Sequence, residues 1–281
     1  MTEQITKRKL QNILQKLSTR DMEILYALLK YRYMTTHHLR RLFFVGAVSK
    51  PAALRSCNRV LAKLRGLGII CALNRRIGGV RAGSGAFVWT LTPNGIKLLT
   101  IDEYNEETTP RKRSYEPSFA FLQHKLACVE IAVRLHELHM VKKLTLVNIT
   151  NEPDCWRVYS GISGEVKRLK PDLFTVTAVG EYEDNWFLEL DLASEAPSTV
   201  LKKCMQYIAY YRTGVEQRKS GVLPYVVWIV PDRKRQVSLH TYIQKSMPEK
   251  EAELFIVIVM DEFEPLLTLG AERFMKERTL P

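Results

Sequence analysis

Three carboxylates in the second half of the chain have a spacing that suits phosphodiester chemistry. Asp172 opens a predicted strand, and seventeen residues later the next strand ends in Glu189 and Asp191. Two carboxylates at the paired ends of a hairpin can share one divalent cation, and hard oxygen ligands suit Mg²⁺ or Mn²⁺. Such a cation can activate water and hold a phosphodiester, with added positive charge from Lys202 or Lys203 on the following helix. The pattern therefore predicts a metal-dependent DNA nickase or nuclease as one function.

A second interpretation of the same residues is purely structural. Asp172 and Glu189 can be acids at strand ends that form ion pairs with Lys170 and Lys203, without any catalytic role. The residue types and their spacing are compatible with both interpretations, so the elements around them must be considered.

The second half of the chain alternates helical and extended patterns. A long apolar-periodic helix is predicted over residues 118–139. Further helices are expected at 197–213, 233–247 and the C-terminus, and strands at 144–149, 156–159, 172–179, 186–191, 225–230 and 253–260. This order predicts a mixed sheet sandwiched by helices, and residues 118–281 as one α/β domain.

This arrangement resembles the PD-(D/E)xK nuclease fold. In that superfamily the Asp and the Glu are metal ligands, a Lys two residues after the Glu orients water, and a helical Glu often joins them, matched here by Glu130. Some branches add a QxxxY motif, which Gln206 and Tyr210 match. Asp191 stands where the motif has Lys, and a carboxylate can add a metal ligand but not a cation. The resemblance therefore implies either a lysine supplied from the next helix or a fold that has lost cleavage, and we favour the second.

The basic residues of the chain are concentrated in its first part. Residues 1–113 contain 21 Lys and Arg against 7 Asp and Glu, a net charge of +14. Residues 114–281 contain 21 against 23, a net charge of −2, and the two parts sum to +12. This asymmetry indicates a polyanionic partner for the first part. A membrane surface is a weaker interpretation, because the basic residues do not lie on one amphipathic helix.

The first hundred residues have the element order of a winged helix-turn-helix. Three helices are predicted, beginning after Ser18, near Thr35 or Thr36, and at Pro51, and the third has an apolar stripe of Leu54, Val60, Leu61 and Leu64. Strands at 69–73 and 86–91 flank a Gly-rich basic tip at 74–85, and Thr92 caps a further helix. We expect this domain, residues 1–100, to bind double-stranded DNA. The side chains expected to contact DNA are Arg55, Asn58, Arg59 and Lys63 on the third helix and Arg75, Arg76 and Arg81 on the tip.

Several classes of protein and site are disfavoured. No apolar run reaches the ~18–20 residues that cross a bilayer, and the first residues lack a secretory signal, so we expect a cytoplasmic protein with no membrane partner. The five cysteines lack zinc-site spacing, which indicates free thiols. No GxGxxG or GxxxxGK[ST] fingerprint and no HxH triad of a relaxase is present, although a regulator that senses a small molecule stays open. The polar segment 101–117 is predicted to be a linker.

Taken whole, the chain resembles the replication-relaxation family of plasmids and integrative mobile elements. The matching residues are 89–95, His124, Glu130, Pro171-Asp172, 187–191 and Tyr210-Tyr211. The resemblance implies a winged helix followed by a nuclease-like domain, usually with Asp at the place of Asp191, and a link to plasmid replication and DNA relaxation. We expect a DNA-binding protein that acts in replication or its transcriptional control, as a homodimer and with a relaxase or replication initiator as a further partner. DNA binding needs no cofactor, whereas Mg²⁺ or Mn²⁺ would be needed for cleavage by the second domain.

Overall fold

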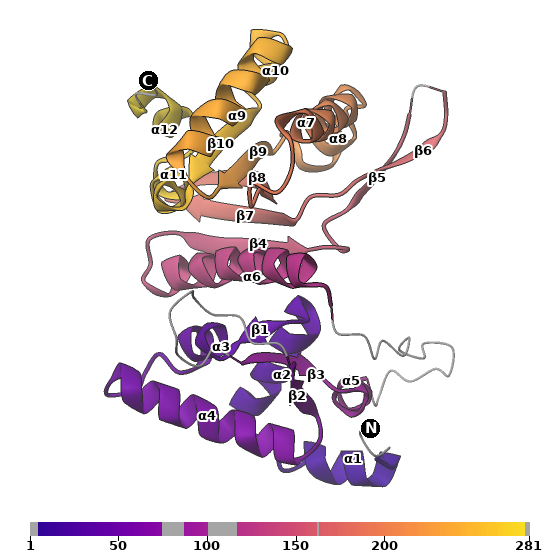
Figure 1. Cartoon of the computed structure of the whole chain (residues 1–281), viewed down its shortest axis with the longest axis vertical. Helices are drawn as coiled ribbons and strands as arrows, with labels where there is room; N and C mark the ends of the chain where they lie inside the picture. Colours follow the sequence, from indigo (N-terminus) through magenta and orange to yellow (C-terminus); the bar gives the residue numbers. More distant parts are fainter. Residues whose placement is uncertain (1–4, 75–86, 101–116, 162, 279–281) are drawn as a thin grey trace. The chain divides into compact units, whose positions relative to one another are not determined.

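The computed structural model describes residues 5–74, 87–100, 117–161 and 163–278. The chain forms two compact units, residues 1–137 and residues 138–281, and the boundary falls inside the long helix α6 (Phe119–Met140). Figure 1 shows the elements of each unit. Nearly all of the expected tip at 74–85 and linker at 101–117 lies outside the described residues, and Arg75, Arg76 and Arg81 lie there with the tip.

Unit 1 contains the predicted three helices and two strands, together with elements that the sequence patterns did not predict. Its elements are α1 (Lys7–Leu14), α2 (Thr19–Tyr31), β1 (Met34–Thr35), α3 (Thr36–Phe43), α4 (Lys50–Gly66), β2 (Ile70–Ala72), β3 (Val88–Leu91), α5 (Pro93–Leu99) and the first part of α6. The capping box of Ser18 at α2 is confirmed, and Thr92 caps α5 as expected. The strands β1, β3 and β2 form an antiparallel sheet in that order. The elements that the sequence patterns did not predict are α1 and β1.

The buried stripe of α4 differs from the predicted one. Ala53, Cys57, Leu61 and Leu64 are buried, whereas Leu54 is 43% exposed. These four positions recur every three to four residues, so they lie on one face of an α-helix. The prediction was wrong at Leu54 because the small Ala53 and Cys57 were not counted as core residues. Leu54 therefore lies on the solvent side, next to the polar residues of the helix.

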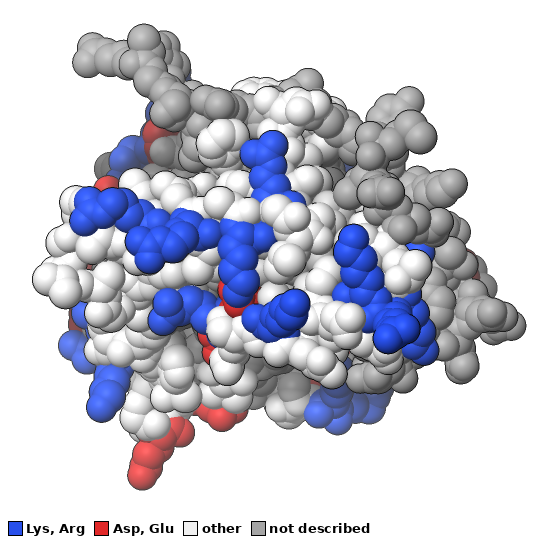
Figure 2. Space-filling model, turned by 90° about the horizontal axis from the view of Figure 1, so that it is seen from below, with Lys and Arg blue, Asp and Glu red and all other residues white. Residues whose placement is uncertain are grey.

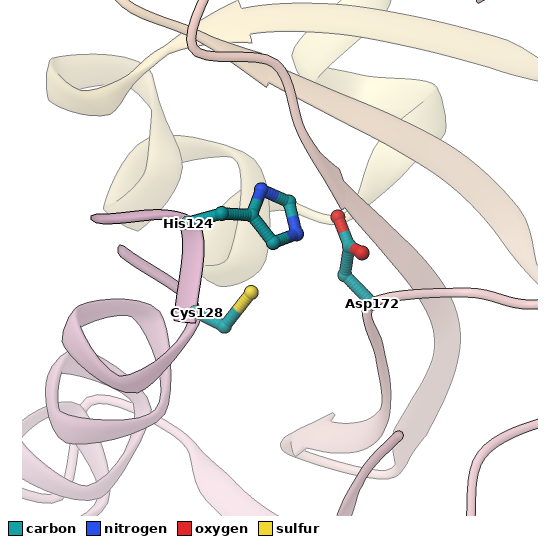
Figure 3. A group of neighbouring side chains, drawn as sticks. All are labelled: His124, Cys128 and Asp172. Atoms are coloured by element: carbon teal, nitrogen blue, oxygen red, sulfur yellow. The ribbon is translucent and has the colours of Figure 1, made fainter. Parts of the chain in front are cut away.

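The first part of α6 packs with unit 1, although the sequence patterns assign residues 118–137 to the second domain. Leu122 and Leu126 are buried in a cluster with Tyr33 and Val88. Figure 3 shows His124 and Cys128 one turn apart on the same helix. The apolar periodicity that predicts the helix does not indicate which domain its side chains contact.

Unit 2 is built on a mixed sheet, as predicted, and five strands form it. Its strand order is β10-β9-β8-β7-β4; β4, β7 and β8 pair antiparallel, whereas β8, β9 and β10 pair parallel. The sheet strands are β4 (Thr145–Asn151), β7 (Leu173–Val179), β8 (Tyr182–Leu190), β9 (Tyr225–Val230) and β10 (Phe255–Val259). A separate two-stranded ribbon pairs β5 (Arg157–Ser160), which matches the strand predicted at 156–159, with β6 (Val166–Leu169), which was not predicted.

Helices cover the sheet of unit 2 and complete its core. They are α7 (Pro197–Arg212), α8 (Val215–Ser220), α9 (Arg233–Ser246), α10 (Glu249–Ala252), α11 (Phe263–Leu269) and α12 (Ala271–Glu277), with a short 3₁₀ turn at Met260–Glu262. One large cluster joins Cys204 and Tyr207 of α7 and Leu239 of α9 to Phe187 and Trp228 of the sheet. Figure 1 shows α7 and α9 on the same side of the sheet. The whole is a mixed α+β fold, and within the described residues no helix is long and apolar enough to cross a membrane.

Candidate functional site

The antiparallel pairing of β7 and β8 brings two of the predicted acidic residues opposite each other. Leu173 pairs with Leu188, so the same register sets Asp172, directly before β7, opposite Glu189. Figure 3 shows Asp172 at the start of this strand. Its Oδ2 atom accepts a hydrogen bond from the backbone N–H of Leu190 at 2.8 Å, which holds the carboxylate against the end of β8. The expected hairpin therefore brings Asp172 and Glu189 to one end of the sheet.

Glu189 is fully buried, and both of its carboxylate oxygens have partners on α7. The ammonium group of Lys203 donates to Oε2 at 2.5 Å, and the hydroxyl of Tyr207 donates to Oε1. Lys203 and Tyr207 are four residues apart, so they lie on the same face of the helix. The Lys203 ammonium also lies 5.9 Å from the ring of Trp228, which pairs with Glu189 in the sheet. The predicted lysine of the next helix thus contacts Glu189 directly.

Burial and neighbouring charges shift the pKa values at this acidic site, which comprises Asp172, Glu189, Lys203 and Tyr207. Burial, with a contribution from the Asp172 charge, raises the pKa of Glu189 to about 8, against the opposing effect of Lys203. Burial lowers the pKa of Lys203, but the charges of Glu189 and Asp172 outweigh this effect, so the pKa lies above its ordinary value. Burial also raises the pKa of Tyr207. One lysine beside two buried carboxylates is electrically neutral when Glu189 keeps its proton, and this state fits the cost of burying charge.

Asp191, the third predicted carboxylate, lies in a separate ion pair. Arg235 of α9 donates to its Oδ2 atom at 2.6 Å, and the backbone N–H of Ala193 donates to Oδ1 at 2.7 Å. Asp191 is 5% exposed, so this pair is largely shielded from water. Its possible role as an added metal ligand stays a prediction, and a metal ion would have to compete with Arg235.

Glu130, the fourth predicted metal ligand, belongs to a cluster of cations in unit 1. Arg41 of α3 donates to its Oε2 atom at 2.5 Å, and Arg134 donates to Oε1 at 2.9 Å. The backbone N–H of Thr35 donates to Nδ1 of His38, so the proton of that imidazole is on Nε2, which lies 3.4 Å from Glu130. Burial raises the pKa of Glu130, but its hydrogen bonds with His38 and Arg41 outweigh this and lower it to about 2. Glu130 therefore tethers α3 to α6 as an ionised carboxylate.

The two residues of the predicted QxxxY motif have different environments. Gln206 is exposed, whereas Tyr210 is buried and its hydroxyl donates to Glu216 at 2.5 Å. Arg157 of β5 also donates to Glu216, at 2.8 Å. Lys202 is exposed at the surface of α7.

One partner of Glu189 and one partner of Asp191 were missed from the sequence. Tyr207 could have been found from its position one helical turn after Lys203, since side chains four residues apart lie on one face. Arg235 has no such signal, because it is 44 residues from Asp191 and pairs with it only through the packing of α9.

The exposed face of α4 carries the side chains that were predicted to contact bases. Arg55, Asn58 and Arg59 are all exposed on the side opposite the buried stripe. Within the described part of the chain, neither Arg55 nor Arg59 forms an ion pair. Lys63 differs from them, because its ammonium group donates to the buried carboxylate of Asp21 at 2.6 Å. Its predicted DNA contact stays a prediction, with a competing partner inside the protein.

The surface around α4 is strongly basic. Between Glu23 and Asp102 the chain contains 13 Lys and Arg and no Asp or Glu. Figure 2 views the molecule from the side on which α1 and α4 lie in Figure 1, and shows Lys and Arg spread across that face with few Asp and Glu among them. A surface of this kind attracts a polyanion, since only part of its positive charge, such as that of Lys63 beside Asp21, is compensated by acids.

Comparison with models of protein families gives a match. The family model described as replication-relaxation matches residues 25–226, which include both the basic helix α4 and the acidic pair of Asp172 and Glu189. No curated protein and no solved structure matches the chain.

Proposed function

The chain belongs to the replication-relaxation family, and we propose that it acts in the replication of a plasmid or other mobile element by binding duplex DNA through unit 1. The observation that carries this proposal is the exposed face of α4. It presents Arg55, Asn58 and Arg59 from a helix within a segment that has no acidic residue. Arg and Asn are the side chains that pair with guanine and adenine in the major groove, and an α-helix fits that groove.

The element order of unit 1 supports a winged-helix mode of binding. α3 and α4 follow α2 as the two helices of a helix-turn-helix, and β2 and β3 follow as the strands of a hairpin beside β1. In such domains the second helix of the motif enters the major groove. We therefore assign α4 as the recognition helix.

A comparison of charge-matched variants tests this proposal. The double variant Arg55→Ala/Arg59→Ala removes two cations from α4, and Lys234→Ala/Lys245→Ala removes two exposed cations from α9 as its control. Binding of each full-length protein to fluorescent duplex DNA from the element's origin region is measured by anisotropy. We expect weaker binding by tenfold or more for the α4 variant only. Equal binding by both variants would mean that α4 does not contact the DNA.

For unit 2 we propose a nuclease-like fold that does not cleave. Three features support this: Glu189 is buried, its two oxygens accept from Lys203 and Tyr207, and its raised pKa favours a protonated carboxyl. A metal ligand must be ionised, so a divalent cation would have to displace both the proton and the lysine.

The alternative is a Mg²⁺- or Mn²⁺-dependent nickase or nuclease, favoured by the opposition of Asp172 and Glu189 and by the lysine beside them. In that reaction the two carboxylates would hold the cation, and Lys203 would stabilise negative charge on the phosphate. Incubation of supercoiled plasmid with each metal separates the two proposals. Metal-dependent nicking that disappears in both Asp172→Ala and Glu189→Ala would establish the alternative, whereas no nicking by the wild-type chain supports the non-cleaving fold.

A further inference from the structure

A groove of about 800 Å³ is lined by α3, α4 and Trp89 of β3. His37 and Arg40 line the wall formed by α3, and Leu54, Asn58 and Arg65 line the wall formed by α4. The three α4 residues lie at the edge of its exposed face, beside Arg55 and Arg59, because each residue of an α-helix advances by about 100°. The groove therefore adjoins the helix face that we assign to the major groove of DNA.

The walls of this groove are held together by buried contacts. The indole Nε1–H of Trp89 on β3 donates to Oγ1 of Thr36 at 2.9 Å, and the backbone N–H of Thr36 donates to the carbonyl of Phe87 at 3.1 Å. The thiol of Cys57 on α4 donates to the Thr36 carbonyl at 3.8 Å. One residue thus joins α3, α4 and β3. A groove built in this way keeps its shape before a ligand binds, which favours selective recognition.

The side chains of the groove combine three kinds of chemistry. Asn58 offers an amide that can donate and accept, and Leu54 and Phe87 expose 43% and 39% of their surface. Arg40 and Arg65 add positive charge, and no Asp or Glu lines the groove within the described residues. An amide beside apolar groups, with cations at the rim, matches an adenine–thymine base pair better than a guanine–cytosine pair. Adenine presents a donor and an acceptor to the major groove, thymine presents a methyl group, and phosphates lie alongside.

We propose that this groove selects A·T base pairs, with Asn58 bound to the edge of an adenine and Leu54 and Phe87 against a thymine methyl group. Arg40 and Arg65 contact the flanking phosphates. Asn58 and Leu54 are four residues apart, so their Cβ atoms lie about 5–6 Å apart on the helix surface. Successive base pairs are spaced by about 3.4 Å, so the adenine and the methyl group belong to the same pair or to pairs one or two steps apart. The inference rests on the proposed binding of duplex DNA by unit 1.

Selection of binding sites from a pool of random duplexes tests the assignment of Asn58. The full-length wild-type chain is expected to enrich sites with a defined A·T position. Asn58→Ala is expected to lose that preference and to bind the selected site tenfold or more weakly, while its binding to unselected duplex at low salt changes much less. Ala is a better helix former than Asn, so the variant keeps α4. Ser56→Ala, at a half-buried position on the same helix outside the groove lining, is the matched control and should keep the wild-type preference.

Replacement of thymine by deoxyuridine in the selected duplex tests the apolar contact separately, because it removes only the methyl group. The wild-type chain is expected to bind the uracil duplex about fourfold more weakly, the effect of one buried methyl group. Leu54→Ala should reduce that difference. Unchanged base preference in Asn58→Ala, or equal wild-type affinity for the two duplexes, overturns this inference even when duplex binding is strong. No duplex binding by the wild-type chain would instead overturn the proposed function.

Discussion

Substitution of Glu189 by Gln should change how the stability of the protein depends on pH. Glutamate in an unfolded chain ionises near its ordinary pKa of 4.5, whereas burial raises the pKa of Glu189 in the fold to about 8. Between these two pH values the folded chain keeps a proton that the unfolded chain has released. The stabilisation from this proton is complete below pH 4.5 and is lost as the pH rises toward 8.

The size of this effect follows from the two pKa values. Each pH unit across the window should lower the free energy of unfolding of the wild type by ~1.4 kcal/mol relative to Glu189→Gln, up to ~5 kcal/mol over the whole window. Gln resembles a protonated Glu in shape: its amide oxygen can accept from Lys203, and its NH2 group can donate to the hydroxyl oxygen of Tyr207, as the proton of a neutral Glu would. We therefore expect the two proteins to differ little near pH 5 and the variant to be the more stable at pH 8.

Urea unfolding followed by tryptophan fluorescence measures this difference, since Trp186 and Trp228 are buried in the same unit. Both proteins are titrated at pH 5, 6, 7 and 8, so that other ionisable groups cancel in the comparison. Lys203→Met serves as the contrasting variant, because it removes the cation and leaves the acidic pair unbalanced, at an expected cost of ~3–5 kcal/mol at neutral pH. A wild type that gains stability relative to Glu189→Gln as the pH rises would refute the protonated state.

Four further substitutions test contacts that support the two units. Arg41→Met should destabilise the protein by ~3–5 kcal/mol, because it leaves the carboxylate of Glu130 without the more buried of its two arginines. Arg134→Met, at the more exposed pair, should cost under ~1 kcal/mol, and equal losses in urea unfolding would contradict the difference. Ser18→Ala removes the N-cap of α2 and should cost ~1 kcal/mol, read from the same unfolding curves, and no loss would mean that the capping box is not stabilising. Arg157→Met removes the cation beside the buried Glu216, which keeps only the hydrogen bond from Tyr210, and should lower the melting temperature measured by circular dichroism; an unchanged value would show that this ion pair is dispensable.

Local patterns predicted much of the fold. The strand at 225–230 has its predicted ends, because an all-apolar run between Pro224 and Pro231 has few other conformations available in a folded chain. The starts of α2 and α5 were also predicted, since Ser18 and Thr92 have side-chain oxygens that accept from the first turn of each helix. These features depend on residues close together in the sequence.

Features that depend on residues far apart in the sequence were harder to predict. Leu54 was assigned to the core although it faces solvent, because the choice of buried face depended on how α4 packs against α3, where Cys57 contacts Thr36. The contact between Lys203 and Glu189 was anticipated as a possibility, but the role of Tyr207 and the pairing of Asp191 with Arg235 were not. Such pairs form when helices pack on a sheet, and no spacing within one element indicates them.

The salt dependence of DNA binding tests the central claim most directly. If the basic face of α4 and its neighbours contacts DNA phosphates, the logarithm of the association constant should fall linearly with the logarithm of the salt concentration. Contacts with four or more phosphates would give a slope of about −4 or steeper. The double variant Arg40→Ala/Arg65→Ala, at the two arginines assigned to phosphates, should bring the slope closer to zero by up to ~2, whereas Lys234→Ala/Lys245→Ala should leave it unchanged. A wild-type slope near zero, or no binding at low salt, would contradict the account.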